Sequence, residues 1–220
     1  MRAMILAAGR GERMRPLTDS LPKPLLEIRD KPLIQYHIEN LVRSGMTSIV
    51  INHALFGVQI ERYLGDGSRF GAQISYSPEG DIPLETGGGI FKALPLLGSD
   101  PFIVVNADIW TDFPFHTLPA EPERLGHLVL VPNPSHHPGG DFSLEDGRAG
   151  VEGRPLYTYC GIAVYHPELF ANCRGGAFSL VPLLRNAIIK QQITAELYRG
   201  DWLDIGTPER LETLRKKAYK

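Results

Sequence analysis

Short apolar runs alternate with helix-like segments over the first 130 residues, and this alternation constrains the fold more than any other feature. Short continuous apolar runs are typical of strands buried on both faces of a sheet, and the alternation of polar and apolar residues at 73–76 also indicates a strand. The segments between them repeat apolar residues at helical spacing. In chain order, runs at 3–8, 48–52, 73–76, 102–105 and 127–131 enclose helical segments at 33–42, 58–64 and 89–97. This order predicts an α/β protein with a mostly parallel sheet and helices on both faces.

The remaining residues continue this pattern less regularly. Residues 133–155 are rich in proline, glycine and histidine, and Asp146-Gly147 predicts a hairpin turn within them. Further strands are expected at 157–165 and 196–203, and helices at 180–189 and 208–218. No internal repeat or long linker divides the chain, so we expect a single domain over residues 1–220.

Composition excludes several classes of protein. The 23 basic residues are balanced by 25 acidic ones, so there is no overall positive field for nucleic-acid binding. The first apolar run is too short for a signal peptide or a membrane span. Cys160 and Cys173 form no Cys-x-x-Cys pair, which argues against structural zinc and for two reduced thiols. We therefore expect a cytoplasmic protein without a nucleic-acid or membrane partner.

The densest chemical signal follows the first run. Gly9 and Gly11 leave backbone amides accessible to an anion, and Lys23 lies between two prolines that stiffen its backbone. Arg10, Arg13 and Arg15 add three more cations to the same loop. A bound triphosphate would best compensate the positive charge of this cluster. The simpler alternative is a tight turn with solvated arginines. The P-loop pattern is absent from the sequence. The dinucleotide fingerprint is also absent, because Met14 stands where its third glycine belongs.

Polar residues end two other predicted strands. Asn52-His53 follows the run at 48–52, and Asn106-Ala107-Asp108 follows the run at 102–105. In parallel sheets the carboxyl ends of the strands lie at one edge, where ligands bind. The pattern therefore predicts one site that contains the glycine loop and both strand ends.

These motifs together resemble the sugar-1-phosphate nucleotidyltransferases. Residues 6–18 read LAAGRGERMRPLT and residues 21–25 read LPKPL, which is similar to the family signature. Four further segments resemble family motifs in the same order: 32–36, 85–89, 106–108 and 202–207. The resemblance covers essentially the whole chain. It implies a Rossmann-like three-layer sandwich of the nucleotide-diphospho-sugar transferase type, with residues 1–130 binding nucleotide and residues 131–220 binding sugar and closing the fold.

Other segments narrow the resemblance. Those at 52–54, 65–71, 76–80, 84–97 and 110–112 resemble the branch that transfers uridylyl from UTP to N-acetylmuramate α-1-phosphate in peptidoglycan recycling. The implied reaction gives UDP-N-acetylmuramate and pyrophosphate. Two alternatives stay open: a mannose-, heptose- or glucose-1-phosphate nucleotidyltransferase that uses another nucleotide, and a catalytically silent sensor of nucleotide sugars.

The resemblance also assigns residues to roles. It implies Arg13 and Lys23 as catalytic groups on the phosphates, and Mg²⁺ held by Asp108 and Asp204. The nucleotide-binding set is Ala8, Gly9, Gly11, Glu12, Arg13, Lys23, Thr86, Gly87 and Gly88. The sugar-phosphate-binding set is Glu85, Asn106, Asp141 and Arg154.

Two positions depart from the family pattern. The metal motif reads Asn-Ala-Asp where the family usually has Asn-Gly-Asp, so Ala107 would strain a turn that needs positive φ. Many relatives carry a lysine in Glu-Lys-Pro, whereas residues 152–155 read EGRP, which makes Arg154 the candidate replacement. Because the larger relatives add assembly domains that are missing here, we expect a monomer.

Overall fold

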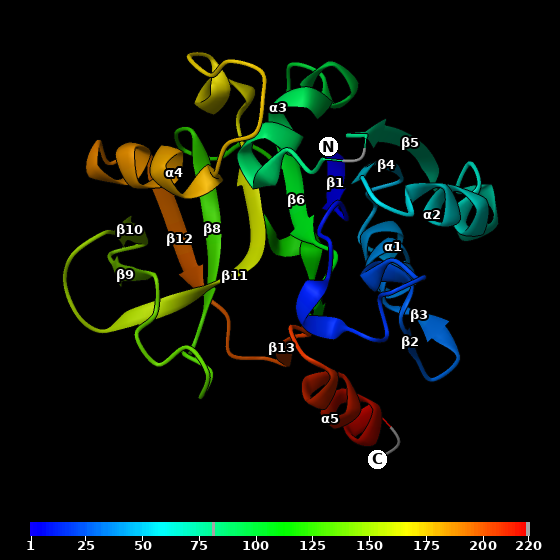
Figure 1. Cartoon of the computed structure of the whole chain (residues 1–220). Helices are drawn as coiled ribbons and strands as arrows, with labels where there is room; N and C mark the ends of the chain where they lie inside the picture. The colour runs from blue at the N-terminus through cyan, green and yellow to red at the C-terminus, as the bar shows by residue number, and fades with distance from the viewer. Residues whose placement is uncertain (81, 219–220) are drawn as a thin grey trace.

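A nine-stranded sheet forms the centre of the computed structural model, which describes residues 1–80 and 82–218. The strand order is β5-β4-β1-β6-β11-β8-β12-β10-β9 (Figure 1). Its strands are β1 (Arg2–Leu6), β4 (Ser48–His53), β5 (Gln73–Pro78), β6 (Phe102–Asn106), β8 (Gly126–Val131), β9 (Phe142–Glu145), β10 (Arg148–Gly150), β11 (Leu156–Tyr165) and β12 (Ile193–Leu197). Two small sheets pair β2 (Glu27–Ile28) with β3 (Lys31–Pro32), and β7 (Ile109–Thr111) with β13 (Trp202–Asp204).

The sheet has a parallel half and a mixed half. Strands β5, β4, β1 and β6 run parallel, as the alternating pattern predicted. Strand β11 lies between β6 and β8 and is antiparallel to both. It therefore separates two strands that follow each other along the chain in the main sheet. The α/β class is confirmed, and the antiparallel strands β9, β10 and β11 come from residues 142–165, within and directly after the irregular segment at 133–155.

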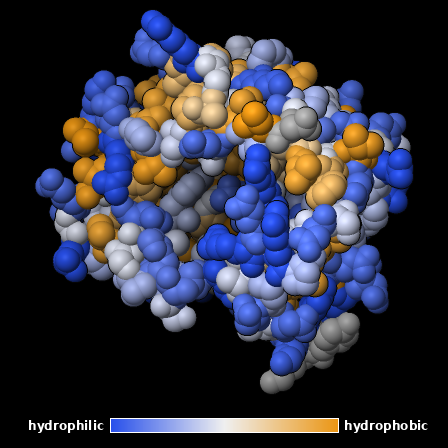
Figure 2. Space-filling model, in the orientation of Figure 1, coloured by the Kyte–Doolittle hydropathy of each residue, from blue (hydrophilic) through white to orange (hydrophobic). Residues whose placement is uncertain are grey.

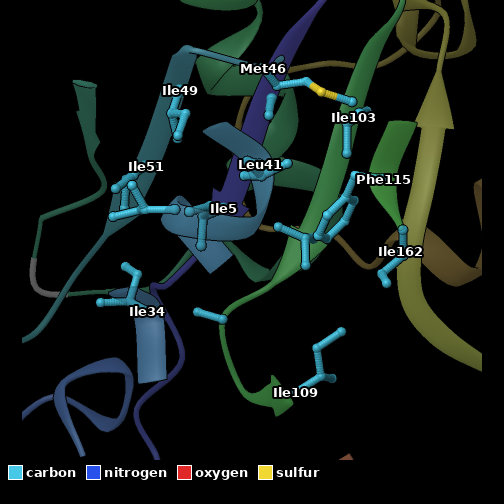
Figure 3. Close-up of a cluster of buried hydrophobic side chains, with 14 of the residues drawn as sticks. Ile5, Ile34, Leu41, Met46, Ile49, Ile51, Ile103, Ile109, Phe115 and Ile162 are labelled. Atoms are coloured by element: carbon cyan, nitrogen blue, oxygen red, sulfur yellow. The ribbon is translucent and has the colours of Figure 1, made fainter. Parts of the chain in front are cut away.

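Helices cover both faces of the sheet. Helices α1 (Leu33–Arg43) and α2 (Gly57–Leu64) pack on one face, and α3 (Glu85–Leu97) and α4 (Leu180–Ile189) pack on the other. Figure 3 shows the first face, where Ile34 and Leu41 of α1 meet Ile5, Ile51 and Ile103 of the strands. All five side chains are at most 1% exposed, so truncating one to alanine would cost about 2–5 kcal/mol.

A third cluster anchors the glycine loop. Met14 is fully buried with Leu211 and Leu214 of helix α5 (Pro208–Ala218) and with Ile28 and Leu33. Met14 is the residue that replaces the third glycine of the dinucleotide fingerprint. Its burial means that the loop is fixed here by an apolar anchor, which a glycine could not supply.

The predicted hairpin forms, whereas the last predicted strand is divided in two. The Asp146-Gly147 hairpin is confirmed, with φ of 46° and 75° at its two central residues. The strand expected at 196–203 is wrong as one element, because β12 ends at Leu197 beside β8 and β13 begins at Trp202 beside β7. Both cysteines are free thiols. Across the described residues, no helix combines the length and the apolar character needed to cross a membrane.

Candidate active site

A cavity of about 680 Å³ opens at the carboxyl ends of β1, β4 and β6. Figure 2 shows a hollow near the middle of the displayed face, bordered largely by hydrophilic residues. Ten residues assigned to the site from the sequence line the cavity: Ala8, Gly9, Gly11, Glu12, Arg13, Lys23, Glu85, Thr86, Asn106 and Asp108. The structure thus brings the glycine loop, the 85–86 segment and the end of β6 together in one place.

The glycine loop packs against the segment that follows it in the chain, which contains Thr18 and Lys23. Gly11 has a φ of 63°, and a Cβ there would lie 3.1 Å from the Thr18 side chain and 3.2 Å from that of Lys23. The buried Thr18 hydroxyl donates to the Gly11 carbonyl at 2.8 Å. Glycine at position 11 therefore allows the loop to pack against the segment that carries Lys23. Arg13 lines the cavity without an ion-pair partner among the residues that the structure describes.

Lys23 and Asp108 face each other in this cavity. The Lys23 Nζ lies 2.7 Å from Asp108 Oδ2, which makes a charge-assisted hydrogen bond. The Lys23 side chain is only 9% exposed, whereas that of Asp108 is 41% exposed. The ammonium is thus fixed in a largely buried position, and the carboxylate remains open to the cavity.

A backbone framework positions Asp108. The amide of Ala107 donates to the Leu6 carbonyl at 3.0 Å, and the amide of Ile205 donates to the Asp108 carbonyl at 2.8 Å. Next to it, the fully buried His37 ring contacts the Ile109 carbonyl through Nε2 at 2.8 Å, and burial lowers the His37 pKa to about 4. A neutral ring therefore donates this bond. Ala107 does not have a positive φ, so the strain expected for the Asn-Ala-Asp turn is absent.

Asp204 points to a different set of partners. Its Oδ2 accepts a hydrogen bond from Arg210, and His136 Nε2 lies 2.8 Å from its Oδ1. The same Nε2 also lies 2.8 Å from Arg210 Nη1. When Nε2 accepts from the guanidinium, it has no proton for the carboxylate, and Asp204 Oδ1 is left buried without a donor within the described part of the chain. Asp204 is not among the residues that line the cavity.

The start of α3 combines strain with tight packing. Glu85 lines the cavity with a φ of 57°, an unfavourable left-handed conformation for a residue with a side chain. Gly88 donates its amide to the Phe178 carbonyl at 3.1 Å, and a Cβ on it would lie 2.2 Å from the Gly176 carbonyl oxygen. A Cβ on Gly87 would lie 2.5 Å from the Phe178 ring. These contacts explain both glycines by packing, and their role in nucleotide binding stays a prediction.

Two candidate sugar ligands lie outside the cavity. Asp141 accepts a hydrogen bond from the Tyr159 amide at 2.8 Å and contacts His137 at 3.0 Å. Arg154 is exposed on the surface. Neither residue lines the cavity, so their role as sugar-phosphate ligands also stays a prediction.

Sequence reasoning placed Asn52 at this edge of the sheet but missed Glu79 and its pairing with Asn52. Asn52 and Glu79 line the cavity, are 2% and 8% exposed, and lie 2.6 Å apart between Nδ2 and Oε1. Asn52 ends a buried strand in the same way as Asn106, and this signal places both residues at the site. Glu79 follows β5 without such a pattern.

No group of three or more His, Cys, Asp or Glu side chains in the described ranges is arranged to hold a metal ion by itself. Carboxylate oxygens are nevertheless the ligands that Mg²⁺ prefers, and Asp108 offers one toward the cavity. Asp204 Oδ1 is a buried oxygen that has no hydrogen-bond donor in the described part of the chain, and a cation would suit it. The Asp108 carboxylate therefore fits a hard divalent cation that takes its other ligands from substrate and water, and an ion shared with Asp204 stays a prediction.

Comparison with known proteins gives the family. A family profile described as Nucleotidyl transferase matches residues 2–137. An N-acetylmuramate alpha-1-phosphate uridylyltransferase of Neisseria meningitidis serogroup B is 50% identical, covering 99% of this chain and 98% of that protein. One of Caulobacter vibrioides with the same name is 34% identical, over 94% of this chain and 92% of its own length.

A solved structure supports the fold. HddC from Yersinia pseudotuberculosis, complexed with GMP-PN, superposes with a TM-score of 0.78 at 20% identity and covers 100% of this chain and 99% of its own. At this identity the likeness shows the fold alone. The family profile spans more than half of the chain, and two relatives align over nearly all of it. The chain therefore belongs to the nucleotidyl transferase family.

Proposed function

We propose that this protein transfers the uridylyl group of UTP to N-acetylmuramate α-1-phosphate, in peptidoglycan recycling in the cytoplasm. The observation that carries the proposal is the 50% identity, over 99% of the chain, to a protein named for that activity. An oxygen of the sugar phosphate attacks the α-phosphorus of UTP. The bond from that phosphorus to the β-phosphate bridging oxygen breaks, and pyrophosphate leaves with the electron pair.

The chain's own groups act on charge and position, because this displacement needs no protein nucleophile. Backbone amides from Ala8 to Arg13 surround the triphosphate, with Glu12 at the edge of the loop. Arg13 has no competing carboxylate among the described residues and neutralises the departing pyrophosphate. Lys23 places a compact positive charge at the α-phosphate, where negative charge increases in the transition state. Its burial supports this role, because a fixed charge in a partly dry site needs little reorganisation during the reaction.

Asp108 and Asp204 would hold Mg²⁺. The ion would supply positive charge that neutralises phosphate oxygens during the displacement. Asp108 also holds the Lys23 ammonium at 2.7 Å, so the same carboxylate orients the lysine. Arg210 donates to Asp204 Oδ2 and holds that carboxylate in a fixed place, which would leave Oδ1 for the ion.

The rest of the cavity accommodates the nucleoside and the sugar. Thr86 and the neighbouring Gly87 and Gly88 would meet the base, and Glu85 and Asn106 would meet sugar hydroxyls. All cavity-lining residues except Gly206 come from residues 1–130, which supports a nucleotide-binding first part. Asp141 and Arg154 would contact the sugar phosphate from the second part. Strand β11 joins both parts in one sheet, which supports a single domain, and we propose that it acts as a monomer.

A matrix of nucleoside triphosphates against sugar 1-phosphates, read by pyrophosphate release, tests the proposal. We expect UTP with N-acetylmuramate α-1-phosphate to give the highest kcat/KM. A clearly higher kcat/KM for a mannose, heptose or glucose phosphate would overturn the substrate. If no pair releases pyrophosphate while UTP still binds, the protein would be a sensor of nucleotides.

A further inference from the structure

We propose that Asn52 and Glu79 are positioning residues that form a hydrogen-bonded bridge between the phosphate-binding loop and the base-side loop of the cavity. This inference rests on the proposed function, because it concerns how one nucleotide contacts both loops. It gives a role to a buried carboxylate that the reaction itself does not use.

The bridge connects three strand ends and the start of a helix. At one end, the amide of Ala7, directly before the glycine loop, donates to Asn52 Oδ1 at 2.9 Å. Asn52 Nδ2 donates to Glu79 Oε1 at 2.6 Å, and at the other end the amide of Leu84 donates to Glu79 Oε2 at 2.6 Å. Strands β1, β4 and β5 lie side by side here, with α3 across them (Figure 1). The bridge therefore links the residue before the glycine loop to the residue before Glu85.

The order of donors and acceptors permits only one arrangement. A backbone donor stands at each end of the bridge. The amide of Asn52 accepts one hydrogen bond and donates another, and the carboxylate of Glu79 accepts two. Flipping the Asn52 amide would place its NH₂ group against the Ala7 amide. The pairing therefore fixes the orientation of both side chains.

Burial makes this polar pair energetically costly. Glu79 is 8% exposed and has no basic partner in the described part of the chain. A buried carboxylate without a cation is costly, and an apolar residue would fill the same space at lower cost. Helix α3 also leaves room for the pair, because a Cβ on Gly89 would lie 2.5 Å from Glu79 Oε1 and 2.8 Å from Asn52 Nδ2. The helix thus packs directly against the bridge.

The consequence is a fixed separation between two loops that contact opposite ends of UTP. Preorganised loops lower the entropy cost of binding. Breaking the bridge should therefore weaken the binding of UTP more than the binding of the sugar phosphate. The loss should appear mainly in the Kd and KM for UTP. A residue needed only for folding would lower stability without this selectivity.

Exchanging the two side-chain types provides a direct test. In Glu79→Gln, an NH₂ group faces either the Leu84 amide or Asn52 Nδ2, so two donors oppose each other. In Asn52→Asp, two carboxylates face each other. The double variant Asn52→Asp/Glu79→Gln restores every pairing, because the new carboxylate accepts from the Ala7 amide and the new NH₂ group, and the new carbonyl accepts from the Leu84 amide.

We would measure UTP binding by calorimetry, KM for both substrates and the melting temperature. Each single variant should weaken UTP binding by about tenfold or more, while KM for the sugar phosphate changes less than about twofold. The double variant should return UTP binding to within about threefold of wild type. The control is Gln35→Glu, since Gln35 makes a similar amide–carboxylate bond of 2.7 Å to Glu39 outside the cavity and should leave UTP binding unchanged.

Single variants that bind UTP like wild type would overturn the bridge, and so would a folded double variant no better than the weaker single one. If the single variants do not fold, the double variant alone decides, by its UTP binding. Failure of wild type to bind UTP would overturn the proposed function instead. In that case the positioning role in UTP binding would fall with the proposed function, and recovery of the melting temperature in the double variant would show only that the Asn52–Glu79 hydrogen bonds stabilise the fold.

Discussion

Lys23 and Asp108, 85 residues apart in the sequence, meet at 2.7 Å between Nζ and Oδ2. The buried partner is the lysine, and the exposed partner is the aspartate. One contact therefore fixes the position of a cation and orients a carboxylate that faces the cavity. Two predictions concern this pair directly.

Lys23→Ala should lower kcat far more than it raises KM for UTP, because its charge acts mainly in the transition state. We expect kcat/KM to fall by about 100-fold or more, with poor rescue by Lys23→Arg, since a planar guanidinium does not replace a compact ammonium. Lys31→Ala is the matched control, because Lys31 makes a 2.7 Å ion pair with Glu39 outside the cavity. An unchanged kcat in Lys23→Ala would remove Lys23 from catalysis.

Asp108→Asn and Asp204→Asn should each lower kcat/KM by roughly 100-fold, or about 3 kcal/mol, while the protein stays folded. If both hold one ion, the double variant should be little worse than the weaker single one. Pyrophosphate release measured as a double-mutant cycle checks this, with Asp201→Asn as a control for the exposed Asp201–Lys217 ion pair. Fully additive losses would show that the two carboxylates do not share an ion.

Gly9→Ala should separate ligand binding from stability. A Cβ at Gly9 has no neighbour within 4 Å and φ there is not positive, so the free energy of unfolding should stay the same or rise by about 0.5 kcal/mol. If phosphates approach the Gly9 amide closely, KM for UTP should rise by about tenfold. Gly88→Ala, whose Cβ would lie 2.2 Å from the Gly176 carbonyl oxygen, should instead lower the melting temperature. A normal KM in Gly9→Ala would place the phosphates elsewhere.

Glu85→Gly should make the protein more stable and less active. Its φ of 57° costs about 1 kcal/mol in a residue with a side chain, and glycine removes that cost. Glu85→Ala keeps the strain, so both variants should lose similar activity while only the glycine variant gains stability in urea unfolding. Equal stability of the two variants would show that the left-handed conformation carries no cost.

His37 should make folding sensitive to acid. Burial lowers its pKa from 6.5 to about 4, so between these pH values the unfolded chain binds a proton that the folded chain does not. The free energy of unfolding should therefore fall as the pH drops through this window, by roughly 3 kcal/mol in total. His37→Gln, which keeps a donor for the Ile109 carbonyl, should reduce this dependence in urea unfolding at pH 7 and 4.5. The exposed His116→Gln serves as the control, and an equal acid sensitivity in both variants would contradict the assignment.

Local pattern was sufficient for the parallel half of the sheet and for the glycine loop. Apolar runs and glycines act within a few residues, so β1, β4 and β6 and the cavity at their ends follow from them. The end of β12 did not follow, because residues 196–203 change partner from β8 to β7, and pairing is a long-range property.

The same limit applies to individual side chains. Gly87 and Gly88 suggest an open loop in the sequence, yet the segment at 176–178 occupies the space beside them. Glu79 has no local pattern, and its burial depends on Asn52 from another strand. The contact of Asp204 with His136 likewise joins two distant segments, residues 204–210 and the loop around residue 136.

The position of β11 has a consequence for synthesis on the ribosome. Strand β6 pairs with β1 on one side and with β11 on the other, and β8 pairs with β11 and β12. While residues 156–197 are still untranslated, a nascent chain carries one open edge on β6 and two on β8, and both strands are strongly apolar. Open edges of this kind favour pairing with other chains. Productive folding therefore waits for β11, and a fragment that ends near residue 137 would aggregate although it contains nearly all of the cavity.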